Sequence, residues 1–323
     1  MMNTTVIVPT YQRPDDLYRC LESLKRQKLP AYEVIVVVRD DDAGTWSMLH
    51  QFVAENLNLK FQRVMIPGQI AAMNAGLEMV TGDIIAFTDD DASPHIDWIQ
   101  KITTYFESDS KVGGVGGRDV IQNSQSELRA SKKKVGQLSW YGRIVGNHHR
   151  GLGNPREVDI LKGVNMSFRS VAVENLCFDS RMLGSGAQVH NEIAFCLSLK
   201  RNGWKIIYDP SIQVDHYAAQ RFDEDQRNQF NSLAYLNAVH NETVALLDHL
   251  SPLQRFVFSL WSIFVGSSQA FGLLQWVRFF PTFGSLATQR LLASWQGRRC
   301  GWATWRSSSK VFPRYHARDS QSA

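Results

Sequence analysis

The sequence predicts an α/β protein with a doubly wound sheet in its first part and a helical region towards its C-terminal end. The main indication is that strand-like and helix-like segments alternate over roughly the first 90 residues. The composition agrees, because 44% hydrophobic and 20% charged residues in a chain of 323 are typical of a globular protein with a sizeable core. The charge is uneven, since the net +4 divides into +8 from Ser251 onward and −4 before it. We therefore expect a protein of two parts.

Each predicted element follows from a local pattern. Thr5–Val8 is a β-branched run that Pro9 ends, and Val34–Val38 is a continuous apolar run typical of a strand buried on both faces of a sheet. Pro14 suits the first position of a helix whose apolar residues recur at helical spacing. The expected elements after these are a helix at 46–55, a strand at 61–66, a helix at 69–80 and a strand at 83–87.

Polar and charged residues follow the ends of the predicted strands. Thr10–Arg13 follow the first strand, Arg39–Asp42 the second and Asp89–Asp91 the fourth. Because ligands bind outside the carboxyl ends of the strands in open α/β sheets, we expect these groups to meet at one edge. Two common nucleotide motifs are missing: the sequence has no G-x-x-x-x-G-K-[ST], and Asp119 stands where a G-x-G-x-x-G motif needs its last glycine.

The three aspartates Asp89–Asp91 form the acidic turn, which is unfavourable unless something offsets its charge. A divalent cation with a phosphate ligand would do so, and Asp89 and Asp91 can reach one ion from a turn. The alternative is a cluster that caps a helix before Pro94, because Asp favours turns and N-caps.

Several stretches of the sequence, in the same order, resemble the family 2 glycosyltransferases of the GT-A fold. They are residues 6–13, 74–77, 82–91, 162–169, 191–204, 209–210 and 214–216. The resemblance implies a mixed, doubly wound sheet with a Rossmann-like nucleotide-sugar half at 1–120 and an acceptor half at 121–220. A helical, membrane-proximal region would occupy 221–323. It also implies inverting, metal-dependent transfer from a nucleoside-diphosphate sugar, with UDP as the expected nucleotide.

The resemblance assigns roles to individual residues. Those expected to contact the nucleotide sugar are Pro9, Thr10, Tyr11, Arg13, Arg39, Asp40, Asp42, Asn74, Asp89 and Asp90. Those expected to bind Mn²⁺ or Mg²⁺ are Asp89, Asp91 and His216, and those expected on the acceptor side are Gly163, Asn165 and Met166. The second strand end reads Arg39–Asp42 where the family often has Asp-Asp-Gly-Ser, so either Asp40 or Asp42 could meet the base, and a solvated charged loop is the alternative.

Glu192 is the candidate general base. On a helix expected over 189–201 it lies in line with Phe195, Cys196 and Leu199, at the head of an apolar stripe. Partial burial there would raise its pKa towards a useful basicity. The family usually has Glu-Asp at this place, with the second acid as base, and here the pair is Asn191–Glu192. The alternative is an acid that only favours the helix N-terminus electrostatically.

The C-terminal region contains 22 residues without a formal charge, Phe256–Val277. This run is long enough to span a bilayer, but its hydropathy is marginal and a single span would export the basic tail. We expect an interfacial helix or a re-entrant pair, with 279–295 as a second amphipathic element on an anionic membrane face. A helix packed on the catalytic domain or on a second subunit is the alternative.

The remaining expectations concern compartment and partners. The scattered cysteines are typical of a reducing compartment, so we expect the catalytic domain at the cytoplasmic face of a membrane. The expected acceptor is a glycan or a lipid-linked glycan, residues 123–156 are expected to form a loop over it, and no nucleic-acid module is recognisable. Two other functions remain open: a membrane-tethered sugar-nucleotide or glycan-binding subunit without turnover, and a sugar nucleotidyltransferase.

Overall fold

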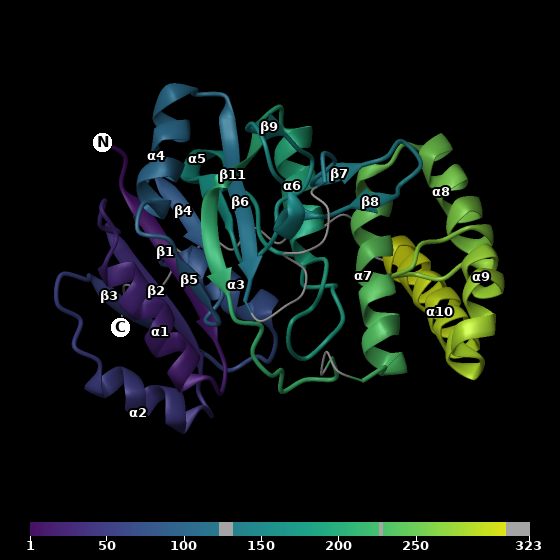
Figure 1. Ribbon diagram of the computed structural model, residues 1–323, viewed down its shortest axis with the longest axis horizontal. Coiled ribbons are helices and arrows are strands. Elements are labelled where there is room, and N and C mark those ends of the chain that lie inside the picture. The colour runs from purple at the N-terminus through teal and green to yellow at the C-terminus, as the bar shows by residue number, and fades with distance from the viewer. Residues whose placement is uncertain (123–131, 226–228, 308–323) are drawn as a thin grey trace.

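The computed structural model describes residues 1–122, 132–225 and 229–307, and it has an α/β body with a group of helices at one end (Figure 1). The first strands and helices alternate as predicted. They are β1 (Thr4–Thr10), α1 (Pro14–Lys25), β2 (Glu33–Arg39), α2 (Ala43–Gln51), β3 (Leu59–Val64), α3 (Gln69–Glu78) and β4 (Ile84–Phe87).

The helix predicted at 46–55 is displaced towards the N-terminus. The Asp42 carboxylate accepts a hydrogen bond from the Thr45 backbone N–H, so it caps α2 and sets its start at Ala43. Phe52 is extended and ends the helix. The following strand is also displaced towards the N-terminus, because β3 spans Leu59–Val64 where 61–66 was predicted.

The second half of the sheet contains antiparallel strands. Its elements are β5 (Ala92–Pro94), α4 (Trp98–Ser108), β6 (Val112–Ile121), β9 (Arg156–Glu157), β10 (Met166–Arg169), α5 (Ser170–Val173), α6 (Asn191–Arg201) and β11 (Lys205–His216). The sheet order is β3-β2-β1-β4-β10-β6-β11-β5, with β9 beside β11. β10 runs antiparallel to both β4 and β6, which makes the sheet mixed, whereas β11 runs parallel to β6.

Helices cover both faces of the sheet, and each face has its own core. Successive residues of β1 point to opposite faces, so Val6 and Val8 pack with α1 and α4, and Ile7 packs with α3 and α6. The glycine run of β6 allows close strand contacts, because a Cβ at Gly117 would lie 1.8 Å from the backbone oxygen of Ile212. This run therefore has a packing function rather than a phosphate-binding one.

A small hairpin connects the sheet to the C-terminal helices. It consists of β7 (Gln137–Leu138) and β8 (Ile144–Val145), and the 3₁₀ helix η2 (His148–Arg150) follows it. It lies within 123–156, the segment expected to be a loop, of which 123–131 lie outside the described residues. In Figure 1 the hairpin lies between the sheet and α8.

The C-terminal region is helical, as predicted, but its uncharged run is not one helix. The helices are α7 (Ser232–His249), α8 (Pro252–Phe264), α9 (Leu273–Phe283) and α10 (Ser285–Ser307). Residues 256–277 divide between α8 and α9, and the second element expected at 279–295 divides between α9 and α10. Among the described residues, no helix is both long and apolar enough to cross a membrane.

Three arginines of this region make contacts within the protein. Arg298 is 5% exposed, forms an ion pair with Glu242 and lies over the Phe258 ring. Arg290 lies over three phenylalanine rings, and Arg255 lies over Trp305. These arginines connect α10 with α7 and α8 inside the helical group, and the basic residues 310, 314 and 318 lie outside the described residues. The charge of the buried Arg298 is therefore paired within the fold.

Candidate active site

The acidic turn, Asp89–Asp91, directly follows β4 at the carboxyl edge of the parallel strands. Asp90 and Asp91 are 2% and 1% exposed. The Arg13 guanidinium donates a hydrogen bond of 2.8 Å to Asp90 and lies 3.8 Å from Asp91. The turn precedes a strand, not a helix, and α4 begins only at Trp98. The structure therefore contradicts the alternative of a helix cap.

His216 completes a set of three possible metal ligands. It ends β11, which pairs antiparallel with β5 and thereby brings His216 beside the acidic turn. One ligand atom each from Asp89, Asp91 and His216 lie within 4.8 Å of one another. Two carboxylate oxygens and one imidazole nitrogen suit Mn²⁺ well and Mg²⁺ less well. The donor set thus fits the divalent cation that the sequence predicted.

Close approach of these groups perturbs their ionisation. Burial and the charge of Asp91 both raise the pKa of Asp89. Burial opposes the ionisation of Asp91, but the hydrogen bond and charge of His216 outweigh it and lower its pKa. Burial also lowers the pKa of His216, yet the neighbouring carboxylates of Asp119 and Asp91 raise it to about 9. Without a metal, a protonated His216 therefore offsets part of the carboxylate charge, and a bound cation would take its place.

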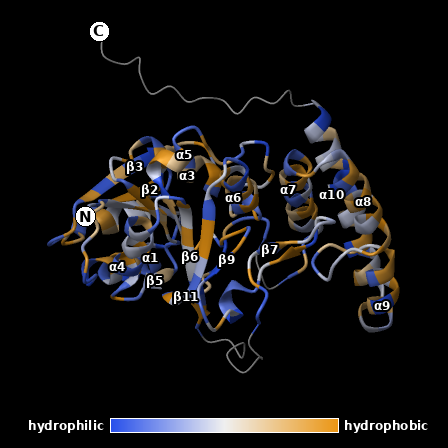
Figure 2. Ribbon diagram, turned by 90° about the horizontal axis from the view of Figure 1, so that it is seen from above, coloured by the Kyte–Doolittle hydropathy of each residue, from blue (hydrophilic) through white to orange (hydrophobic). Residues whose placement is uncertain are grey.

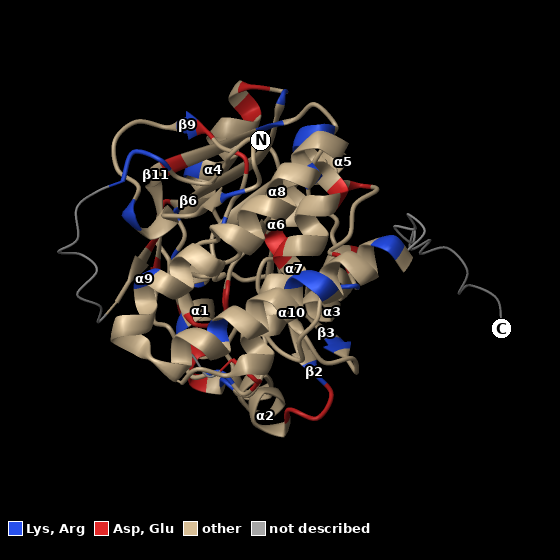
Figure 3. Ribbon diagram, turned by 90° about the vertical axis from the view of Figure 1, so that its right-hand side faces the viewer, with Lys and Arg blue, Asp and Glu red and all other residues tan. Residues whose placement is uncertain are grey.

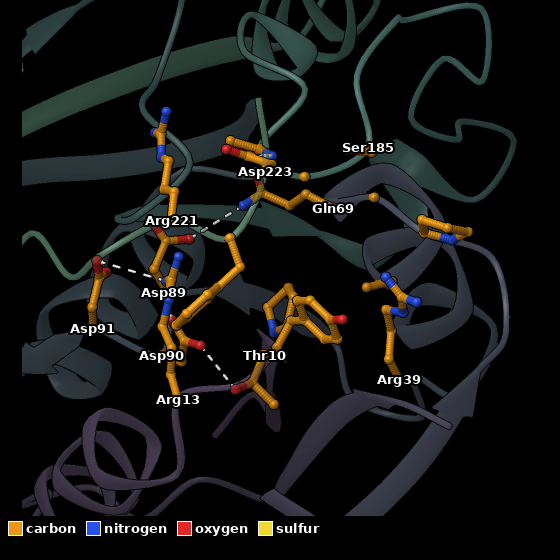
Figure 4. A pocket seen from close by; sticks show the side chains of 18 residues that line it. Thr10, Arg13, Arg39, Gln69, Asp89, Asp90, Asp91, Ser185, Arg221 and Asp223 are labelled. Atoms are coloured by element: carbon orange, nitrogen blue, oxygen red, sulfur yellow. Dashed lines mark hydrogen bonds and ion pairs between the residues drawn. The ribbon is translucent and has the colours of Figure 1, made fainter. Parts of the chain in front are cut away.

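A cavity of about 270 Å³ opens beside the acidic turn (Figure 4). Seven of the residues predicted to contact the nucleotide sugar line it: Pro9, Thr10, Tyr11, Arg13, Arg39, Asp89 and Asp90. The aspartates lie at one end, and Arg39 lies at the other, 4.4 Å from the centre of the Tyr11 ring. The cavity therefore has an aromatic and cationic end, where a base could stack, and an acidic end.

Glu192 lies in the first turn of α6, which begins at Asn191 rather than at residue 189. His190 precedes the helix with a φ of 76°, a left-handed conformation, and Ala187, three residues earlier, lines the cavity. Burial raises the pKa of Glu192, and the negative charge of Asp89 raises it further. A carboxylate with a raised pKa beside a metal site is suited to accept a proton.

The comparison with known proteins decides the family. The sequence model described as Glycosyl transferase family 2 matches residues 5–174, more than half of the chain. The protein belongs to glycosyltransferase family 2. Relatives from Haloferax volcanii match most of its length: Glycosyltransferase AglE is 27% identical over 266 residues, covering 81% of this chain and 80% of AglE. A glucosyl-dolichyl phosphate glucuronosyltransferase is 26% identical over 269 residues, covering 78% and 79%.

Solved structures confirm the GT-A fold of this glycosyltransferase. The mannosyltransferase PcManGT from Pyrobaculum calidifontis, in complex with GDP-Man and Mn²⁺, superposes with a TM-score of 0.57 at 18% identity, covering 94% of this chain and 86% of PcManGT. Residues 1–349 of S. aureus TarS, in complex with UDP-GlcNAc, also give a TM-score of 0.57 at 15% identity, covering 94% and 92%. The mixed sheet and its order agree with the predicted fold class.

Three residues that the resemblance assigned to the nucleotide sugar do not line the cavity of the glycosyltransferase. Asp42 is 3% exposed and uses its carboxylate to cap α2 and to accept from the Gln12 backbone N–H. Asn74 exchanges two hydrogen bonds with the backbone of Phe178. Asp40 is exposed outside the cavity. The first two side chains hold the framework of the site, because their polar atoms are already bonded within the fold.

The predicted acceptor segment is only partly accessible. Asn165 is 1% exposed and binds the Trp98 indole and the Ile212 backbone oxygen, and Met166 is fully buried in β10. These two residues fix the strands, so they are corrected from acceptor contacts to framework residues. Gly163 is half-buried, and a Cβ there would meet no atom within 4 Å, which leaves open space beside Lys162.

Asp119 is a site residue that the sequence reasoning missed. It is 1% exposed, forms an ion pair with Lys162, and its Oδ2 lies 3.9 Å from Nδ1 of His216. The other imidazole nitrogen of His216 lies 3.3 Å from Asp91. A carboxylate that holds the far nitrogen of a metal-binding histidine orients the ring and makes it a better ligand. No sequence motif indicates this role of Asp119, because its contact with His216 arises from the pairing of β6 with β11.

The segment at 217–225 after β11 closes one side of the cavity, and the sequence reasoning missed it too. Arg221, Phe222 and Asp223 line the cavity. Asp223 accepts a 2.8 Å hydrogen bond from the Ala187 backbone N–H, and Arg13 donates to the backbone oxygen of Gln220. The segment is thus bonded to Arg13, which also binds Asp90 of the acidic turn, and to Ala187 in the loop before α6.

Proposed function

We propose that this glycosyltransferase transfers a sugar from a UDP-sugar, with inversion, to a hydroxyl of a glycan or lipid-linked acceptor in polysaccharide or glycoconjugate synthesis. One observation carries the proposal: the possible ligands Asp89, Asp91 and His216 lie together at the acidic end of a cavity. The buried Glu192, whose pKa is raised by burial and by the charge of Asp89, supplies the proton acceptor. A binding subunit has no need of a carboxylate with a raised pKa at this place.

The donor would lie along the cavity. The base stacks at the Tyr11–Arg39 end, and the diphosphate lies at the acidic end. Asp89, Asp91 and His216 would hold Mn²⁺ or Mg²⁺, which when bound offsets the negative charge that develops on the departing diphosphate. Arg13 keeps Asp90 oriented towards the ribose side of the cavity through its 2.8 Å contact.

Glu192 acts as the general base. It takes the proton of the acceptor hydroxyl, and the hydroxyl oxygen forms a bond to the anomeric carbon. The bond from that carbon to the diphosphate breaks on the opposite face, and its electron pair leaves with the diphosphate. The raised pKa of Glu192 makes it a stronger base than an ordinary glutamate.

The variant Glu192→Gln tests this assignment. It should retain Mn²⁺-dependent thermal stabilisation by UDP but lose transfer from labelled UDP-sugars by about 100-fold to 10,000-fold, as removal of a general base does. Glu174→Gln, at the exposed end of α5, is the matched control and should transfer normally. Near-normal transfer by Glu192→Gln would refute the role of Glu192. Failure of every nucleotide sugar to stabilise the wild-type protein would refute the donor site.

We also propose that the enzyme works at the cytosolic face of a membrane, bound through the apolar face of α8 and α9. Nine large apolar side chains on these helices are 38–62% exposed: Leu253, Phe256, Leu260, Ile263, Phe264, Leu274, Val277, Phe280 and Phe283. Figure 3 shows this face with few charged residues on α8 and α9, and Figure 2 shows both helices as largely hydrophobic. Such a helix pair suits the interfacial region of a bilayer.

A further inference from the structure

We propose that the acceptor is a membrane lipid that carries a phosphate, and that four basic residues beside the catalytic centre bind this phosphate. They are Arg118, His149, Arg150 and Lys162, here called the cationic cluster. The inference rests on the proposed function and adds the chemical class of the acceptor. Figure 3 shows basic residues on the side of the molecule where β6, β9 and β11 lie.

The members of the cationic cluster come from three segments that meet behind Asp119. The Arg118 side chain donates a 3.1 Å hydrogen bond to the backbone oxygen of His149, and Lys162 pairs with Asp119. Burial lowers the pKa of His149, Asp119 opposes this shift, and the positive charges of Lys162, Arg150 and Arg118 add to it. Arg118, Arg150 and Lys162 thus surround a largely neutral His149, and an anion placed beside them would be attracted to three positive charges.

A run of lysines extends the cluster towards solvent. Lys132, Lys133 and Lys134 are exposed. The Lys132 backbone N–H donates a 3.0 Å hydrogen bond to the Arg150 backbone oxygen, so the run is attached directly to the cluster. An anionic headgroup approaching from solvent would meet these lysines first and the half-buried cluster next.

The cluster is joined to the apolar face of α8 by the β7–β8 hairpin. At its turn, a Cβ on Gly142 would lie 2.5 Å from the Phe258 ring of α8, so the backbone sits directly on that ring. Tyr141 packs against Trp261 of α8 with ring centroids 5.4 Å apart, and Trp140 beside it is 57% exposed. The hairpin thus has basic residues next to its strands and aromatic residues at its turn. This arrangement is complementary to a lipid in which a phosphate is attached to a hydrocarbon chain.

Lys162 connects the cluster to the chemistry. Its charge lowers the pKa of both Glu192 and Asp89 against the effect of burial, and its amine contacts Asp119. The charge of Lys162 therefore acts on the general base, and its contact with Asp119 places it beside Arg118, the preceding residue of β6. An acceptor could present its hydroxyl to Glu192 while its phosphate lies beyond Lys162 and its chain lies along α8.

Vesicle binding tests the proposal. The probe is hexadecyl phosphate in phosphatidylcholine vesicles, compared with hexadecanol in the same vesicles, with flotation as the readout. Wild-type protein should prefer the phosphate vesicles, and Arg118→Gln/Arg150→Gln should reduce that preference by about 10-fold to 30-fold, the effect of two charges near an anionic surface. Lys28→Gln/Lys111→Gln removes the same net charge at exposed positions elsewhere and should keep the preference.

Three results would overturn the proposal: no preference in the wild type, an unchanged preference in Arg118→Gln/Arg150→Gln, or an equal loss in the control variant. Competition by glycerol phosphate as strong as that by hexadecyl phosphate would show a soluble phosphate site and would overturn the lipid assignment. Stabilisation of the wild-type protein by UDP and Mn²⁺ is measured separately. Its absence would refute the proposed function without bearing on the phosphate preference.

Discussion

Membrane binding by α8 can be tested by removing apolar surface that the fold does not need. Phe256, Leu260 and Phe264 are 62%, 43% and 54% exposed on one helix. We expect the triple variant Phe256→Ser/Leu260→Ser/Phe264→Ser to fold normally, because the buried anchor of α8, Phe258, stays in place. The perturbation therefore acts on the outer face alone.

The expected effect follows from the exposed fractions. Burying a whole Leu or Phe side chain is worth about 1.5–3 kcal/mol, so the exposed half of each contributes about 1 kcal/mol in a bilayer. Three such side chains give roughly 3 kcal/mol, which corresponds to about a 100-fold loss of vesicle affinity. Electrostatic attraction would change little, because the substitutions alter no charge.

The assay is co-sedimentation with phosphatidylglycerol–phosphatidylcholine vesicles, with thermal unfolding as a check on folding. A matched control is Val53→Ser/Met65→Ser/Ile66→Ser, whose side chains are 62%, 76% and 66% exposed on the nucleotide half. It should bind vesicles as the wild type does. Equal binding by the α8 variant and the wild type would refute the membrane surface. Conversion of a wild-type dimer to a monomer by the α8 variant would show instead that the face joins two copies.

Three further predictions concern ionisable groups. The acid limb of the kcat/KM–pH profile should lie above pH 4.5, because Glu192 acts when deprotonated and its pKa is raised; a limb at or below that pH would contradict the assignment. Asp119→Asn should lower the unfolding free energy of the metal-free protein by about 2 kcal/mol at neutral pH, because the pKa of Asp119 is lowered from 3.8 to about 2. Urea titration should show that the difference between variant and wild type vanishes as the pH falls through that range. Glu33→Gln should lower the free energy of unfolding by roughly 2–3 kcal/mol above pH 4.5. Hydrogen bonds from Lys60, Thr5 and Thr81 outweigh the burial of Glu33 and lower its pKa to about 2. A loss of stability that persists at pH 2 would point to packing instead.

The nucleotide half of the fold could be predicted well from the sequence, because its signals are local. The buried strands β1, β2 and β4 are apolar runs, and α1 has Pro14 at its start and a regular apolar stripe. The boundary of α2 was wrong because it depends on a single carboxylate, Asp42, whose role as a cap competes with a role in binding. The turn at Gln12 favours the capping role of Asp42, because Gln12 has a φ of 56° and its backbone N–H donates a hydrogen bond to the Asp42 carboxylate.

The site was predictable where a motif marked it and not where strand pairing created it. The acidic turn and His216 were found through the resemblance, and the structure brings them together. Asp119 could not be found in this way. In the parallel pair β6–β11, His216 stands opposite Ile121, and Asp119 lies two residues earlier on the same face of β6. Only this register places its carboxylate behind the imidazole.

The position of Asp119 also links the two substrates. The same oxygen, Oδ2, faces Lys162 of the cationic cluster and Nδ1 of His216. A change at this carboxylate therefore affects both a possible metal ligand and a cation of the proposed phosphate site, Lys162, whose charge also acts on Glu192. Asp119→Asn should then raise the KM for both donor and acceptor, whereas Glu192→Gln, which removes only the proton acceptor, should lower kcat with donor binding intact. An effect of Asp119→Asn on one substrate alone would show that the two sides of the site act independently.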